Sequence, residues 1–292
     1  MSKFILSIRH YIEYFIVIVI YFIIRFLPLR LSSITVLLII KSVKNFSKNQ
    51  KIALQNCRHV FPKYNNNKIN CIVNKSWENL GKTIFELFRL NEIMKKKKNF
   101  IIEGKHIVDE IINSKSRAIF ISIHQSNWEV CVPLLDKLGI SVGAIYRHIN
   151  NSLIDKFIFN RRTMSLKSNS SFYTPKGRKS AKDIIEGIKN NSSIFLLVDQ
   201  KDSAGENISF FNKEVKTQIG FLKIARKNNI PIIPMQNIRL DNGIFKIIFH
   251  EPIYNSNENI ADEMIMLQIH KIIEDWIKSN PTQWFWQHNR FS

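Results

Sequence analysis

Residues 118–129 read AIFISIHQSNWE, and this stretch indicates both the fold and the centre of the chemistry. Its first six residues are apolar apart from Ser122, which is typical of a strand buried on both faces of a parallel sheet. The strand runs directly into His124, and Ser126 or Asn127 is suited to cap a helix that begins there. His124 is therefore predicted at the carboxyl end of a strand, where α/β sheets bind their ligands.

Glu129 follows His124 after a bend in the chain, so the two side chains are expected to meet. A neutral imidazole can accept a proton from a hydroxyl group as that hydroxyl attacks an acyl carbonyl. A carboxylate on the other ring nitrogen fixes the tautomer and stabilises the imidazolium. The pair predicts general-base catalysis without a covalent nucleophile. On spacing alone, the alternative is a histidine that only caps or packs the turn.

Further apolar, β-rich runs follow along the chain, and helical patterns over 179–190 and 217–228 lie between some of them. This alternation predicts an α/β domain over residues 99–292, with a central mixed sheet flanked by helices. The predicted strands lie at 99–103, 118–123, 141–146, 193–198, 230–235 and 243–249.

The N-terminal part has a different texture. Residues 14–24 read YFIVIVIYFII, an apolar run shorter than the roughly 20 residues that span a bilayer. We expect residues 1–30 to form an uncleaved membrane helix that spans the bilayer or lies in its interface. A buried helix of a soluble domain is the alternative. Residues 31–98 are predicted to form a helical arm, broken near Pro62.

Charge also points to a surface partner. The chain carries 43 Lys and Arg against 23 Asp and Glu, a formal charge of +20, which favours an anionic lipid, an acidic protein or nucleic acid. Compositional drift towards lysine is the competing explanation. By the positive-inside tendency, four lysines after the apolar segment predict that the rest of the chain faces the cytoplasm. They are Lys41, Lys44, Lys48 and Lys51.

The three cysteines show no CxxC spacing, so neither a zinc site nor a disulfide framework is expected. No metal and no bound cofactor is predicted.

HQSNWE resembles the HxxxxE form of the motif of lipid A biosynthesis acyltransferases, the late lauroyl- and myristoyl-type enzymes. The resemblance continues in order along nearly the whole chain. Its further elements are Tyr146–Arg147, Arg161–Arg162, PKGRKSAKDIIEGIKNN, LLVDQ ending in Asp199–Gln200, FFNKEVKTQIGFLKIA, IPIIPMQNIR ending in Arg239, and the C-terminal WFWQHNRF. His148 departs from the family, which often has proline there, and this leaves the local geometry open.

The resemblance implies an acyltransferase-like fold and transfer of a fatty acyl chain from acyl carrier protein to a hydroxyl group or hydroxyacyl chain of a lipid A precursor. It implies a place in lipopolysaccharide biosynthesis at the bacterial inner membrane. His124 would be the general base and Glu129 would orient it. Arg147 and Arg162 would bind phosphate or developing charge, with Arg161 as the alternative to Arg162. Substrate is also expected to contact Tyr146, Asp199 and Gln200.

Two other functions compete with this one. A glycerophospholipid acyltransferase of the 1-acylglycerol-3-phosphate type shares the histidine but usually has aspartate at the second position. A membrane-tethered binder of anionic lipid or nucleic acid would show steep salt dependence, but it gives no reason for a His–Glu pair. The expected partners are therefore the carrier protein, the lipid A precursor and the membrane, and not nucleic acid.

Overall fold

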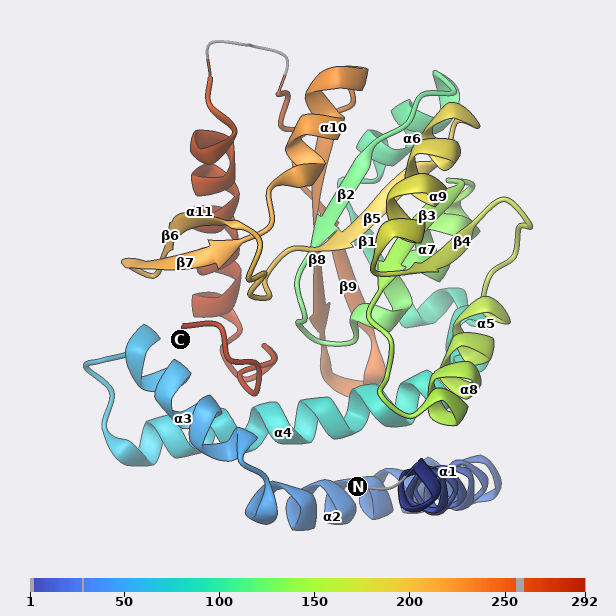
Figure 1. Ribbon diagram of the computed structural model, residues 1–292, viewed down its shortest axis with the longest axis vertical. Coiled ribbons are helices and arrows are strands. Elements are labelled where there is room, and N and C mark those ends of the chain that lie inside the picture. The colour runs from blue at the N-terminus through green and yellow to red at the C-terminus, as the bar shows by residue number, and fades with distance from the viewer. Residues whose placement is uncertain (1–2, 28, 256–259, 292) are drawn as a thin grey trace.

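The computed structural model describes residues 3–27, 29–255 and 260–291 and is built around one seven-stranded sheet (Figure 1). Within the sheet, β8 and β9 are antiparallel, whereas the other neighbours are parallel. This confirms the predicted mixed sheet. In spatial order the strands are β1 (Phe100–Glu103), β9 (Phe245–Phe249), β8 (Ile232–Arg239), β2 (Ile119–Ser122), β5 (Ser193–Leu197), β3 (Val142–Tyr146) and β4 (Phe172–Pro175).

Helices flank the sheet, as expected. Five of the six predicted strand segments contain an observed strand, and the sixth, 230–235, covers only the first half of β8, which continues to Arg239. The sequence pattern did not predict β4, nor the separate hairpin of β6 (Glu206–Phe210) and β7 (Lys213–Thr217). Both are short, and β7 is mostly polar, so neither has a strong apolar signal. The helices are α6 (Lys105–Asn113), α7 (Cys131–Leu138), α8 (Ser152–Thr163), α9 (Arg178–Lys189), α10 (Gly220–Asn228) and α11 (Asp262–Ser279).

The central strand β2 explains why the stretch at 118–129 decides the fold. All four of its residues are buried, and parallel partners lie on both sides, β5 and β8. Parallel pairing brings the carboxyl ends of β2, β5, β3 and β8 to one edge of the sheet. At this edge Ser122 is in register with Leu197, so the residues that follow the two strands begin level with one another.

The described residues of the N-terminal part form a helical arm. Its helices are α1 (Lys3–Phe26), α2 (Leu29–Phe46), α3 (Asn49–Val60), α4 (Asn66–Phe88) and α5 (Leu90–Lys95). The predicted break near Pro62 is present between α3 and α4. Helix α4 begins after Asn65, whose side-chain oxygen caps the helix by accepting the Lys68 N–H. Helix α4 lies beside the carboxyl edge of the sheet, with α2 packed along its other side (Figure 1). The division of the chain into segments at residues 30 and 98 stays a prediction. One buried apolar cluster runs from the helical arm into the sheet.

Helix α1 is the predicted membrane segment. Across residues 3–27, 29–255 and 260–291, no helix is both long and apolar enough to cross a bilayer, so the spanning prediction is not confirmed. Residues 1, 2 and 28 of the predicted segment lie outside the described residues. One face of α1 packs on α8, and the other presents Tyr11, Phe15 and Phe26, which are 63%, 68% and 78% exposed.

Candidate active site

His124 and Asp199 form the best-connected pair at the carboxyl edge of the sheet. Each stands two residues beyond its strand, β2 or β5, and the matched register of the strands places them side by side. The His124 Nδ1 atom lies 2.7 Å from Asp199 Oδ1. Asp199 Oδ2 accepts hydrogen bonds from the His124 backbone N–H at 3.0 Å and from Trp284 Nε1 at 2.8 Å. The carboxylate is thus buried and held by three donors.

The electrostatics keep Asp199 ionised. Burial acts to raise the pKa of Asp199, but the positive charge that His124 carries when protonated, and the hydrogen bonds from His124 and Trp284, bring that pKa below its usual value. An ionised Asp199 accepts the Nδ1 proton of His124, which leaves Nε2 of the neutral ring as the proton acceptor. The Gln200 amide nitrogen lies 3.2 Å from Nε2 and donates to it. An incoming hydroxyl group would take the place of this amide.

Glu129 has a different partner from the one expected. Arg162 donates to it from Nε to Oε2 at 2.7 Å and from a terminal nitrogen to Oε1 at 2.6 Å, a bidentate ion pair. Glu129 lies in a short 3-10 helix, η2 (Trp128–Val130), which Asn127 caps by accepting the Glu129 N–H. The Glu129 carboxylate is therefore bound by Arg162 of α8, and the partner of His124 Nδ1 is Asp199.

Glu129 nevertheless lies within electrostatic reach of His124. Burial raises the pKa of Glu129, whereas the charge and hydrogen bonds of Arg162, with smaller contributions from Trp128 and His124, lower it to a net value below the ordinary one. The Trp128 ring joins the two groups, because it packs edge-on against His124 and donates to Glu129 Oε1. The site is therefore two carboxylate pairs, His124–Asp199 and Glu129–Arg162, bridged by an indole.

The structure separates the two arginines that the sequence left as alternatives. Arg162 binds Glu129 and lies over the Tyr146 ring at 5.7 Å, and the nearby Glu129 charge raises its pKa despite burial. Arg161 turns the other way and donates to the Tyr21 hydroxyl of α1 at 3.1 Å. Arg162 is accordingly part of the site, and Arg161 ties α8 to the N-terminal helix.

Arg147 follows β3 at the same edge and is exposed. No acidic partner for its guanidinium is found within the part of the chain that the structure describes. His148, the departure from the family pattern, lies within 2.6 Å of Asp155, which also accepts the Ile149 N–H. The turn after β3 is thus held by a carboxylate at the start of α8.

The C-terminal WFWQHNRF segment contributes contacts whose role the sequence did not reveal. Trp284 forms an isolated β-bridge with Gln125, and the Phe285 N–H donates to the His124 carbonyl at 2.9 Å. With the Trp284 indole on Asp199, this segment fixes both members of the His124–Asp199 pair. The sequence signal that could have indicated this role is the tryptophan-rich composition of the segment, because a buried indole N–H usually finds a hydrogen-bond acceptor.

Two cysteines are poor candidates for a covalent intermediate. Cys57 and Cys131 are fully buried, and burial raises the pKa of each thiol to about 12. Because the thiolate is the nucleophilic form, these side chains are unreactive at neutral pH. Cys131 packs in the core as a small apolar residue.

Comparison with known families matches residues 1–292 to the model described as bacterial lipid A biosynthesis acyltransferase, which confirms the family, whereas the lauroyl- and myristoyl-type subgroup stays a prediction. The comparison with curated proteins gives no match. Among solved structures, the chain is similar to the 1-acyl-sn-glycerophosphate (LPA) acyltransferase PlsC from Thermotoga maritima. That likeness has a TM-score of 0.41 and 13% identity, over 88% of this chain and 99% of that chain.

Proposed function

Because the chain belongs to the bacterial lipid A biosynthesis acyltransferase family, we propose that it moves a fatty acyl chain from an acyl carrier protein thioester to a hydroxyl group of a lipid A precursor. Family membership makes the chain an acyltransferase; the donor and the acceptor are the proposal. The observation that carries it is the His124 imidazole, whose Nδ1 is held 2.7 Å from a buried carboxylate, so that Nε2 is the free base.

In the proposed reaction, Nε2 of His124 takes the proton of the acceptor hydroxyl as its oxygen attacks the thioester carbonyl. The tetrahedral intermediate collapses with cleavage of the C–S bond, and the imidazolium returns the proton to the departing thiolate. The products are an ester, or an acyloxyacyl group, and the free carrier thiol. Asp199 stabilises the imidazolium between these two proton transfers.

Two arginines supply positive charge beside this base. Arg162 has nitrogen donors beyond those that Glu129 occupies, and these suit an oxyanion developing near His124. Arg147 is exposed at the rim, where its planar fork of donors suits a phosphate group of the acceptor or donor. The formal charge of +20 agrees with an acidic carrier protein and a phosphorylated lipid.

We further propose that α1 lies in the interface of the inner membrane, with the α/β domain on the cytoplasmic side. The exposed residues Tyr11, Phe15, Phe22 and Phe26 recur at helical spacing on one face of α1, and Leu38 of α2 is 61% exposed. An apolar face of this kind binds at the headgroup boundary through buried area and attraction to anionic lipid. The acceptor lipid would then reach the site from the same surface.

Vesicle binding should depend on this face. Replacing both Phe15 and Phe26 by serine is expected to weaken binding to phosphatidylethanolamine–phosphatidylglycerol vesicles at least about tenfold, since each buried phenylalanine contributes roughly 1.5–3 kcal/mol. Co-sedimentation measures the change. Ile185→Ser is the matched control, because Ile185 is 53% exposed on α9, away from α1 (Figure 1). Equal loss in the control, or none in the double variant, contradicts the interfacial placement.

Acceptor choice tests the proposed reaction. Purified full-length protein is incubated with radiolabelled acyl carrier protein thioester and either a lipid A precursor or a lysophosphatidate. We expect label on the lipid A precursor, with a rate at least about tenfold above that on the lysophosphatidate, equivalent to about 1.4 kcal/mol of discrimination. Label on the lysophosphatidate alone would replace the proposed acceptor by a glycerophospholipid. Binding of lipid without any transfer would favour a tethered binding protein instead.

A further inference from the structure

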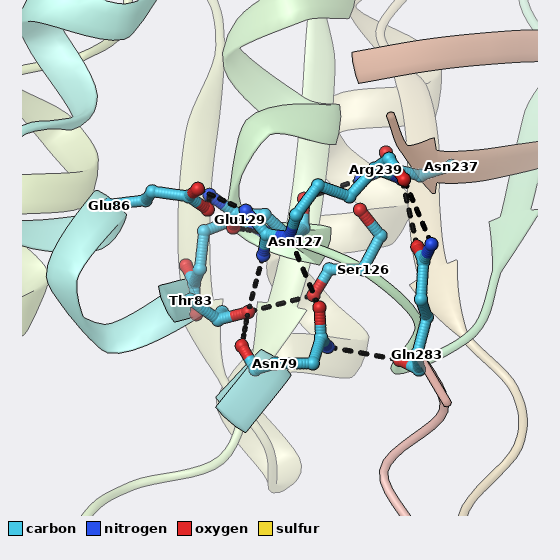
Figure 2. Close-up of polar contacts among 9 residues, drawn as sticks. All are labelled: Asn79, Thr83, Glu86, Ser126, Asn127, Glu129, Asn237, Arg239 and Gln283. Atoms are coloured by element: carbon cyan, nitrogen blue, oxygen red, sulfur yellow. Dashed lines mark hydrogen bonds and ion pairs between the residues drawn. The ribbon is translucent and has the colours of Figure 1, made fainter. Parts of the chain in front are cut away.

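A buried polar cluster joins α4 to the loop that carries His124 and Glu129 (Figure 2). Helix α4 contributes three of its members, and the end of β8 and the C-terminal segment contribute the others that face the loop. Arg239 stands at the centre of this cluster, which also contains Asn79, Thr83, Glu86, Ser126, Asn127, Asn237 and Gln283. None of the α4 or β8 members has a hydrogen bond to His124, so their effect on it passes through the loop.

Ser126 is the part of the loop that most needs support. Its φ of +56° lies in the left-handed region, which is unfavourable for a residue other than glycine. The Ser126 carbonyl accepts the Thr83 hydroxyl at 2.7 Å and the Asn79 amide at 3.1 Å. Its N–H donates to the Gln283 carbonyl at 2.9 Å. The left-handed turn that carries the chain from His124 to Glu129 is therefore fixed from outside the loop.

Asn127 extends the same support to Glu129. Its side-chain nitrogen donates to Glu86 at 2.9 Å, while its side-chain oxygen accepts the Glu129 N–H at 3.0 Å. The Asn127 carbonyl accepts the Asn237 amide at 2.5 Å. The orientation of the Asn127 amide, and with it the start of η2, thus depends on the Glu86 carboxylate.

Arg239 holds the α4 side chains in place. It pairs with Glu86 and donates to Asn79 Oδ1 and to Thr83 Oγ1, each at 3.2 Å. The Thr83 oxygen accepts from Arg239, and its one hydroxyl proton has two acceptors in reach, of which the Ser126 carbonyl at 2.7 Å is closer than the Asn79 carbonyl at 3.0 Å. The side chains of Arg239 and Glu86 are only 8% and 12% exposed, and a buried ion pair of this kind is often no more stable than apolar residues of the same volume. The role of the Arg239–Glu86 pair is therefore sought in the geometry that it imposes on the loop.

We infer that Thr83, Glu86 and Arg239 are positioning residues for acyl transfer, which act by fixing the Ser126–Asn127 backbone and so the placement of His124 relative to Glu129–Arg162. This inference rests on the proposed function, since it concerns the rate of that reaction. Helix α4 then has two structural roles. It packs against α2 in the N-terminal arm, and its polar side chains fix the backbone of the loop that carries His124 and Glu129.

Thr83→Val tests the inference, because it removes the hydroxyl and leaves a side chain of similar shape. We expect kcat for acyl transfer to fall about 10–100-fold, as displacement of reacting groups by up to about 1 Å does, while KM for donor and acceptor changes less than about twofold. Thr83→Ser, which restores the hydroxyl, should return most of kcat. The control is Thr174→Val, the same change at a buried hydroxyl of β4 that bonds to Asp183 of α9 and not to the loop. It should leave kcat unchanged.

A second variant separates positioning from stability. Replacing both Glu86 and Arg239 by methionine removes the ion pair without leaving an unpaired charge, so the thermal midpoint is expected to stay within a few degrees of wild type. Its kcat should nevertheless be at least about tenfold lower, because Asn127 has lost its acceptor. A double variant with wild-type midpoint and wild-type kcat overturns the inference, as does Thr83→Val with wild-type kcat. If wild-type protein transfers no acyl group while remaining folded, the proposed function fails instead.

Discussion

Asp199→Asn is expected to lower kcat for acyl transfer by roughly 10³-fold, within the range that general-base catalysis and tautomer control supply. Three donors converge on the Asp199 carboxylate, from the His124 ring, the His124 backbone and the Trp284 indole. An asparagine can accept with only one of its two side-chain atoms. Its amide group would therefore face one of these donors, and the favoured His124 tautomer would carry its proton on Nε2, where it cannot act as a base.

Initial rates at saturating donor and acceptor measure this effect. Asp202→Asn is the matched control, because it makes the same change at a nearby carboxylate that pairs with Lys176. It should keep kcat within about twofold, since the Lys176 pair lies near the surface and is worth little. An Asp199→Asn protein that is folded and retains more than a tenth of the wild-type kcat would show that Asp199 does not orient the base.

Glu129→Gln is expected to lower both stability and activity. The Arg162 and Glu129 side chains are 16% and 7% exposed, so the substitution leaves a buried guanidinium without its counter-charge. Breaking such a pair costs about 3–5 kcal/mol of unfolding free energy. Urea denaturation followed by circular dichroism measures that loss. Transfer should also slow, because the Glu129 charge acts on His124 and holds the Arg162 donors in place.

A double variant tells these two effects apart. Glu129→Met combined with Arg162→Met removes both charges and should recover most of the lost unfolding free energy, since apolar residues of similar volume often replace a buried pair without loss. Acyl transfer should stay low, because the charge beside His124 is gone. Recovery of activity along with stability would mean that the Glu129–Arg162 pair serves the fold alone.

The stretch at 118–129 allowed much of this architecture to be predicted. A continuous apolar run before His124 indicated a central buried strand, and β2 is buried along its whole length. A cap by Ser126 or Asn127 was also predicted, and Asn127 caps η2, because a cap depends only on residues close together in the chain. Local patterns likewise located β1, β3, β5, β8 and β9, although not β4, and Pro62 marked the interruption before α4.

The residue that binds His124 Nδ1 could not be predicted from the sequence in the same way. Local reasoning favoured Glu129, which is close in sequence, whereas the structure puts Asp199 on Nδ1 from 75 residues away. That pairing depends on β5 being the neighbour of β2 and on the match of Ser122 with Leu197, which no pattern within one strand encodes. The LLVDQ segment did mark Asp199 as a residue at a strand end. The missing information was the order of the strands.

The support of the loop by α4 was hidden for a similar reason. Thr83 and Glu86 look like ordinary members of an amphipathic helix, and only the packing of α4 against the end of β8 turns them towards Ser126 and Arg239. Contacts of this kind link three distant segments at once. They become visible only when the fold is known.

The most direct test of the central claim is the rate of labelled acyl transfer by His124→Ala, measured beside wild type with acyl carrier protein thioester and a lipid A precursor. Loss of the base is expected to lower kcat by roughly 10²–10⁴-fold. The thermal midpoint should stay close to that of wild type, which shows that the variant is folded. Transfer by folded His124→Ala at more than about a tenth of the wild-type rate would contradict the assignment of His124 as the general base.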